Sequence, residues 1–194
     1  SGGIEADEMG TGFGGTDVAG EHRAPLAMGL YHPAVVATGV DVVSTANNHA
    51  LDRGALGADK TIAALKAAGL KYTGTRARTG EKAPWHTTTS ARGLTLAWLA
   101  CTLHTNMIED TARQVLRCFD DKTVEDEVRR LAKDPAIDAV IVTPHWGKEY
   151  TPEPSKQQKD YARAWAEAGA AAIVGSHPHV LQPWEKLATK DGRE

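Results

Sequence analysis

The feature that most constrains the fold of this chain is a pattern that occurs three times: a short apolar run is followed at once by a polar segment that carries histidine or asparagine. The apolar runs cover residues 40–45, 136–142 and 170–174. Each run has the length and the β-branched content of a buried strand. Segments with helical spacing of apolar residues alternate with these runs, at residues 56–68, 123–133 and 155–168. Strands that alternate with helices predict an α/β fold.

A second pattern, in the middle of the chain, predicts that the sheet is not purely parallel. Residues 85–90 and 94–102 have the composition of two strands, and Arg92-Gly93 between them is typical of a tight turn. Residues 115–119 have the composition of a further strand. Because a hairpin is antiparallel, we expect an α/β fold with mixed sheets flanked by helices.

Length and composition predict one domain that follows a terminal loop. A chain of 194 residues, 41% of them hydrophobic, can bury one sizeable core, and no apolar run approaches the roughly 18 residues of a membrane span. Residues 1–22 are rich in glycine and are predicted to be a loop or linker, with the domain at 23–194. A net charge of -3 excludes a broad cationic surface, so nucleic acid is not an expected partner.

The two cysteines, Cys101 and Cys118, leave two alternatives open. Their spacing fits neither a zinc finger nor a redox motif. They are either two buried thiols or one disulfide, and the sequence does not choose between these states because it does not give the distance between their α-carbons.

The polar segments that follow the apolar runs carry residues typical of metal ligands. These residues are Asn48 and His49 after the first run, His145 after the second, and His177 and His179 after the third. Ligands of α/β sheets commonly bind beyond the carboxyl ends of strands, so we expect these side chains to converge. Imidazole nitrogen and amide oxygen are suitable ligands for divalent metals. The structural alternative, that the histidines are turn or packing residues, weakens with each additional strand end.

Further residues near these segments receive weaker predictions. Trp146 adjoins His145 and is predicted to line the site and contact substrate, with core packing as the alternative. Glu149 lies in the same loop and is predicted to contact substrate, although loop polarity alone would also explain it. His86 and His104 lack the context of an apolar run that ends in histidines, so we interpret them as surface or packing residues.

The ordered motifs resemble those of the metallophosphoesterase superfamily and, more closely, those of the bacterial capsule-synthesis CapA family, also called the poly-γ-glutamate synthesis family. The segments that carry the resemblance are VVSTANNHALD at 42–52, HWG at 145–147 with Glu149-Tyr150, and GSHPHVLQ at 175–182. The resemblance covers most of residues 23–182.

This resemblance implies a metallophosphoesterase-like fold in which mixed β-sheets are flanked by helices in αββα order, truncated at both ends relative to the family. It implies two divalent metal ions, for which manganese, zinc and iron are all compatible. By the same resemblance Asn48, His145 and His177 would bind one ion, His179 would bind its neighbour, and His49 would act as general acid. Asp52 would orient His49, or would cap the next helix instead. The early acidic ligands of the superfamily are not identifiable in the sequence.

For function, the resemblance implies a CapA-like protein of poly-γ-glutamate capsule synthesis or processing, with a metal-dependent hydrolase-type site. The expected substrate is this anionic polymer or a phosphoester, and membrane-bound capsule-synthesis proteins are expected partners. The implied location is extracellular or in the cell envelope, although no signal segment is visible in the sequence. Two alternatives stay open: a general metallophosphoesterase, and a non-catalytic module that binds polymer or partner proteins in an envelope assembly.

Overall fold

The computed structural model describes residues 35–79, 83–119 and 122–192. The chain divides into two compact units, residues 1–40 and 41–194. The described part of the first unit contains a helical turn at 35–37, which is followed by Gly39 with a φ of 80°. The predicted linker at 1–22, and its boundary with the domain, lie outside the described residues. The elements that follow all belong to the second unit.

The larger sheet has four strands in the order β3-β4-β5-β6. They are β3 (Thr87–Ala91), β4 (Leu94–Thr102), β5 (Ala139–His145) and β6 (Ala172–Ile173). Strands β4, β5 and β6 are parallel, and β3 pairs with β4 as an antiparallel hairpin. The hairpin turns at Arg92 and Gly93, which both have positive φ, as a two-residue turn of the I′ type requires. The predicted mixture of parallel and antiparallel pairing is confirmed.

A smaller sheet is formed by β1 (Val42–Ser44) and β2 (Lys71–Thr73), which are parallel. Thr73 joins this pair to β4, because its hydroxyl oxygen accepts a hydrogen bond of 3.0 Å from the Ala100 amide and lies 2.9 Å from the Trp98 carbonyl oxygen. Gly74 follows with a φ of 91°, and a Cβ at this position would lie 2.9 Å from the carbonyl oxygen of Ala100. The close approach of the two sheets therefore requires glycine.

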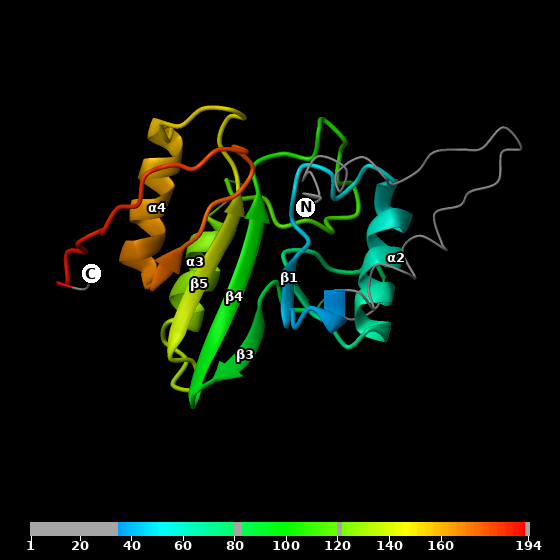
Figure 1. Cartoon of the computed structure of the whole chain (residues 1–194), viewed down its shortest axis with the longest axis horizontal. Helices are drawn as coiled ribbons and strands as arrows, with labels where there is room; N and C mark the ends of the chain where they lie inside the picture. The colour runs from blue at the N-terminus through cyan, green and yellow to red at the C-terminus, as the bar shows by residue number, and fades with distance from the viewer. Residues whose placement is uncertain (1–34, 80–82, 120–121, 193–194) are drawn as a thin grey trace, which may run out of the picture. The chain divides into compact units, whose positions relative to one another are not determined.

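Three helices flank the sheets: α2 (Gly54–Ala67), α3 (Thr123–Leu131) and α4 (Lys156–Ala168). Helix α2 contacts β2, whereas α3 and α4 contact each other and pack on β4 and β6 respectively. Figure 1 shows α3 and α4 on one side of the four-stranded sheet and α2 beyond the β1–β2 pair. This order of helix, two sheets and helix confirms the predicted fold class. No helix in the described part of the chain is long and apolar enough to cross a membrane.

The main core lies between the four-stranded sheet and helices α3 and α4. Its fully buried side chains include Leu99, Val140 and Val142 from the strands and Val128, Leu131 and Trp165 from the helices. Each such side chain contributes about 1.5–3 kcal/mol of transfer free energy. The predicted inward face of α3 is thereby confirmed. Thr123 is the first residue of this helix rather than its cap, and the capping position is held by Lys122, which makes no side-chain cap.

Residues 115–119 do not form the predicted strand. They make only isolated bridges, Val115 with Thr75 and Arg117 with Thr102. The physical reason is that successive amides bond to different elements: the Leu116 amide donates to Gly74 at 2.8 Å, and the Cys118 amide donates to Thr102 at 2.9 Å. A segment whose amides alternate between two partners cannot build a ladder with either one.

Cys101 and Cys118 form a disulfide, with α-carbons 5.0 Å apart, which decides between the two alternatives left open by the sequence. Both residues are buried. The bond joins the carboxyl end of β4 to the segment at 115–119, and it closes a covalent loop around the intervening residues.

Candidate metal centre at the strand ends

Asn48 and His145 meet at the carboxyl ends of β1 and β5. His145 is the last residue of β5, and Asn48 lies in the turn that follows β1. The Nε2 atom of His145 lies 2.9 Å from Oδ1 of Asn48, although the two residues are 97 positions apart in sequence. Since an amide oxygen only accepts, His145 donates through Nε2–H. The structure thus brings together two of the residues that the sequence predicts to converge.

His177 and His179 follow β6 and complete the convergence. The His177 ring centroid lies 4.7 Å from that of His145 and 6.1 Å from that of His179. Both residues have positive φ, of 96° and 56°, which is uncommon for residues other than glycine. The intervening Pro178 is buried, and its carbonyl oxygen accepts a 2.7 Å hydrogen bond from the Tyr150 amide. A tightly held turn therefore presents the two rings.

The electrostatic environment keeps His145 neutral at physiological pH. Burial, together with the neighbouring rings of His177, His104, His179 and His49, lowers the pKa of His145 to about 4. Burial also lowers the pKa of His177, against an opposing effect of Glu149. Metal ligation requires the neutral imidazole, so these rings are in the protonation state that a divalent ion needs.

Ser176 completes the surroundings of the His145 ring. Its hydroxyl oxygen lies 3.0 Å from Nδ1 of His145 and 3.5 Å from the carbonyl oxygen of Pro144. For Nε2 to become a ligand, the ring proton must move to Nδ1, where the Ser176 oxygen accepts it. Ser176 can therefore support either tautomer of His145.

His49 and Asp52 form a pair beside this cluster. Nδ1 of His49 lies 2.7 Å from the carboxylate of Asp52. The Asn106 amide nitrogen lies 3.3 Å from the same Nδ1, but the shorter contact to a charged acceptor places the proton toward Asp52. Helix α2 has Arg53 at its N-cap position, so the alternative of Asp52 as a helix cap is wrong. Asp52 orients the His49 ring, which leaves Nε2 for exchange with a substrate.

The sequence interpretation missed His104 and Asn106. The His104 ring stands edge-on to His177 with centroids 5.6 Å apart, so its interpretation as a surface or packing residue away from the site is wrong. Asn106 accepts a 3.3 Å hydrogen bond from the side-chain amide of Asn48. Both residues follow the carboxyl end of β4, and the strand-end rule that found the other histidines would have found them too. His86, in contrast, bonds Glu127 at 2.9 Å on α3.

Comparison with known proteins decides the family. The family model described as bacterial capsule synthesis protein PGA_cap matches residues 26–192, which is most of the chain. The chain belongs to the PGA_cap family. Its three strand-end motifs all lie within the matched range.

Two curated relatives of the family agree with this assignment. The capsule biosynthesis protein CapA of Bacillus anthracis is 34% identical over 157 residues, which are 78% of this chain and 38% of that protein. The PGA biosynthesis protein CapA of Bacillus subtilis (strain 168) is 33% identical over 147 residues, 74% of this chain and 38% of that protein. The chain thus spans 38% of the length of each relative. A crystal structure of a hypothetical protein from Thermus thermophilus covers 80% of this chain and 63% of that one, at 16% identity and a TM-score of 0.39, a likeness too slight to add to the argument.

Trp146 has a different place from the one the sequence suggests. It is only 5% exposed, and its ring stacks on that of Trp165 with centroids 5.1 Å apart. A Cβ at Gly175 would come within 2.6 Å of the indole nitrogen, so the ring fills the space beneath the turn that carries His177. A side chain this buried offers a substrate little surface. The structure gives Trp146 a packing role instead of the predicted substrate contact.

The donor set fits a divalent ion of intermediate hardness. Neutral imidazoles dominate it, with the amide oxygen of Asn48, and the exposed carboxylate of Glu149 lies beside His177 and His179. Potential ligand atoms of Glu149, His177 and His179 all lie within 4.8 Å of one another. Manganese, zinc and iron are compatible with such donors.

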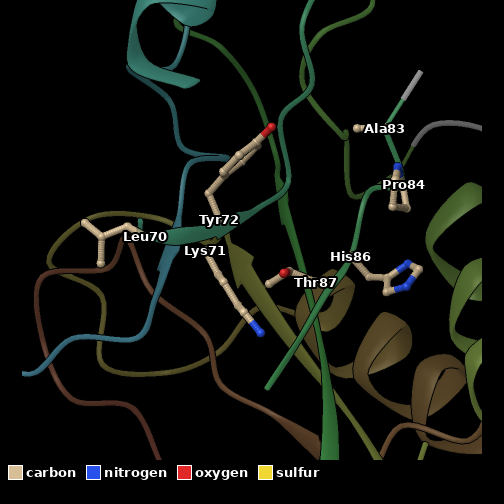
Figure 2. Close-up of a pocket in the computed structure, with 7 residues that line it drawn as sticks. All are labelled: Leu70, Lys71, Tyr72, Ala83, Pro84, His86 and Thr87. Atoms are coloured by element: carbon tan, nitrogen blue, oxygen red, sulfur yellow. The ribbon is translucent and has the colours of Figure 1, made fainter. Parts of the chain in front are cut away.

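A pocket of about 240 Å³ lies elsewhere, at β2 and the segment that leads into β3. Figure 2 shows its lining residues, Leu70, Lys71, Tyr72, Ala83, Pro84, His86 and Thr87. None of the predicted site residues lines it. The Lys71 ammonium donates to the Thr88 carbonyl oxygen at 2.6 Å, so its charge is already engaged with the protein. We therefore place the candidate site at the strand ends and not in this pocket.

Proposed function

We propose that this member of the PGA_cap family carries a metal-dependent hydrolase-type site that processes an anionic capsule polymer, poly-γ-glutamate, in the cell envelope. The observation that carries the proposal is the 2.9 Å contact between Asn48 and His145, with the His177 ring beside it. Residues from three separate strand ends have no packing reason to present polar atoms to one another. A shared ligand gives them one.

Each side chain has a defined part in the proposed chemistry. Asn48, His145 and His177 hold one divalent ion, and His179 holds its neighbour. Bound ions of this kind supply positive charge that polarises the bond to be cleaved and lowers the pKa of water. His49, oriented by Asp52, donates a proton to the leaving group. Trp146 excludes water from beneath the turn, because its ring fills that space.

The substrate class and location come from the relatives. One relative is named a capsule biosynthesis protein and the other a PGA biosynthesis protein. A capsule lies outside the cytoplasm, and the Cys101–Cys118 disulfide supports a location in an oxidising compartment. Membrane-bound capsule-synthesis proteins are the partners we propose there.

The proposal is tested by metal content and hydrolysis together. Purified protein, His145→Ala and Asn48→Ala are loaded with Mn²⁺ or Zn²⁺, desalted, and assayed by plasma mass spectrometry, with His86→Ala as the matched control. We expect two ions per chain in the wild type and in the control, with loss of metal in the two site variants. The same proteins are then incubated with poly-γ-glutamate and with bis-p-nitrophenyl phosphate.

Each result assigns the function differently. Shortening of the polymer supports the proposal. Cleavage of the phosphodiester alone would assign a general metallophosphoesterase instead. Metal without either activity would favour a non-catalytic polymer-binding module, and a wild type that binds no metal would overturn the metal-dependent proposal altogether.

A further inference from the structure

The loop that follows β5 brings an acidic side chain to the turn that follows β6. Potential ligand atoms of Glu149, His177 and His179 all lie within 4.8 Å of one another. Glu149 and His179 are exposed and His177 is half-buried, so an ion from solvent can reach all three. The motif comparison gave Glu149 no part in ligation, and loop polarity was sufficient to explain it.

Backbone contacts hold Glu149 in this position. The Trp146 amide donates to the Ser176 carbonyl oxygen at 3.0 Å, and the Tyr150 amide donates to Pro178 at 2.7 Å. These two bonds lie on either side of Glu149 and tie its loop to the histidine turn. The Tyr150 ring also stacks on the His179 ring, with centroids 5.7 Å apart.

The backbone of the loop adopts unusual conformations to make this approach. Gly147 has a φ of 92°, and a Cβ there would lie 2.9 Å from the Gln158 side chain on α4. Tyr150, His177 and His179 also have positive φ. Strain of this kind persists where surrounding structure holds it, and it is concentrated at functional sites.

We propose that Glu149 is a metal ligand and that, with His177 and His179, it forms a three-ligand site for a divalent ion. This inference rests on the proposed metal centre and gives that centre an acidic ligand beside His179. Two imidazoles and one carboxylate with an open position form a donor set of catalytic zinc sites. The carboxylate also offsets part of the charge of the ion.

The charge of the substrate favours ligation over substrate contact. The proposed substrates are anionic, and a free carboxylate that faces them would be repelled. A carboxylate that binds a cation instead has its own charge compensated and leaves net positive charge toward the substrate. Glu149 as a ligand is therefore compatible with an anionic substrate, whereas Glu149 as a direct contact is not.

The test measures Co²⁺ binding to the full chain, by calorimetry and by the visible absorption of the bound ion. Glu149→Gln keeps the shape of the side chain and removes its charge, and the matched control is Glu153→Gln, which alters another exposed glutamate of the same loop. We expect Glu149→Gln to weaken Co²⁺ binding by about tenfold or more and to change the absorption spectrum. The control keeps the affinity and spectrum of the wild type.

A second variant reports ligation directly and does not depend on loss of binding. Glu149→Cys places a thiolate where the carboxylate lies, and a thiolate on Co²⁺ produces a charge-transfer band in the near ultraviolet. We expect this band in Glu149→Cys and not in a Glu153→Cys variant. Both cysteine variants are compared after circular dichroism shows the fold of the wild type.

The outcomes separate this inference from the proposed function. If Glu149→Gln binds Co²⁺ with the affinity and spectrum of the wild type while His145→Ala loses affinity, Glu149 is not a ligand and the metal centre stands. If the wild type does not bind Co²⁺, both proposals are overturned.

Discussion

The side-chain oxygen of Asn48 lies 2.9 Å from Nε2 of His145, and the same two atoms are the ones proposed to ligate a metal ion. Without metal they satisfy each other. We predict that Asn48→Ala lowers the affinity for Mn²⁺ by about tenfold or more, because it removes an oxygen ligand, whereas Asn48→Asp retains an oxygen and retains binding. Calorimetric titration measures both variants. Equal affinity of Asn48→Ala and the wild type would remove Asn48 from the ligand set.

Asn106 orients the Asn48 amide, since its side-chain oxygen accepts from the Asn48 nitrogen at 3.3 Å. We predict that Asn106→Gly weakens Mn²⁺ binding by about tenfold, as loss of a residue that orients a ligand typically does. Glycine is the substitution of choice because Asn106 has a φ of 49°, which glycine adopts without strain. Met107→Gly is the control, since this neighbour is fully exposed and also has positive φ. If both variants bind alike, Asn106 does not act on the ligand.

Asp52→Asn tests the orientation of His49. The amide can present its NH₂ group to Nδ1 of His49 and thereby favour the tautomer with its proton on Nε2 or turn the ring. We predict that kcat for the hydrolysed substrate falls by about a hundredfold, with metal content unchanged. Asp160→Asn, which alters an exposed residue of α4 paired with Lys156, controls for the loss of a surface charge. A normal kcat in Asp52→Asn would show that His49 needs no such partner.

The disulfide is predicted to stabilise the fold through the unfolded chain. It joins residues separated by 17 positions, and a loop of this length corresponds to about 3 kcal/mol in the chain-entropy description. We expect the Cys101→Ala, Cys118→Ala double variant to lose about this much free energy of unfolding in urea. Wild-type protein reduced with dithiothreitol should match the double variant. Unchanged stability of the wild type on reduction would contradict the prediction.

Glu127 predicts a dependence of stability on acid. Hydrogen bonds from His86 and Arg130 lower the pKa of Glu127 from 4.5 to about 2. Between these values the unfolded chain binds the proton more readily than the native chain, so stability falls as the pH falls through this window. We expect Glu127→Gln to cost about 1–2 kcal/mol at pH 7, after allowance for solvent screening, and almost nothing near pH 2.

Urea unfolding of Glu127→Gln at several pH values measures this difference. Glu153→Gln, an exposed glutamate, is the control and should follow the wild type throughout. A cost for Glu127→Gln that is the same at pH 7 and at pH 2 would show that the ionised carboxylate is not the source of the stabilisation.

Much of the fold could be predicted because helices and buried strands leave periodic patterns in a sequence. The helix expected at 155–168 is observed at Lys156–Ala168, and its start is set by a capping box of Ser155 and Gln158. The strand expected at 136–142 begins later and continues through His145, because its pairing with β4 extends to that residue. Pairing partners are set by the tertiary fold, so composition located this strand but not its ends.

The candidate site was predictable where its residues follow strands and not where they depend on loop geometry. Asn48, His145 and His177 follow apolar runs, and the structure places them together. The approach of Glu149 to the histidines depends on positive φ values at Gly147 and Tyr150. Local sequence does not specify such values outside glycine, and it does not show that Trp146 turns inward onto Trp165.

The Arg92–Gly93 turn offers a place to alter this protein without touching its chemistry. It lies at the opposite end of β4 from Thr102, beyond which His104 and Asn106 approach the other site residues. A strand of 9 residues separates the two ends by about 30 Å. A short affinity peptide inserted in the turn, or a fluorophore attached to it, can therefore serve to immobilise or follow the protein while the far end of the sheet stays open to ions and polymer.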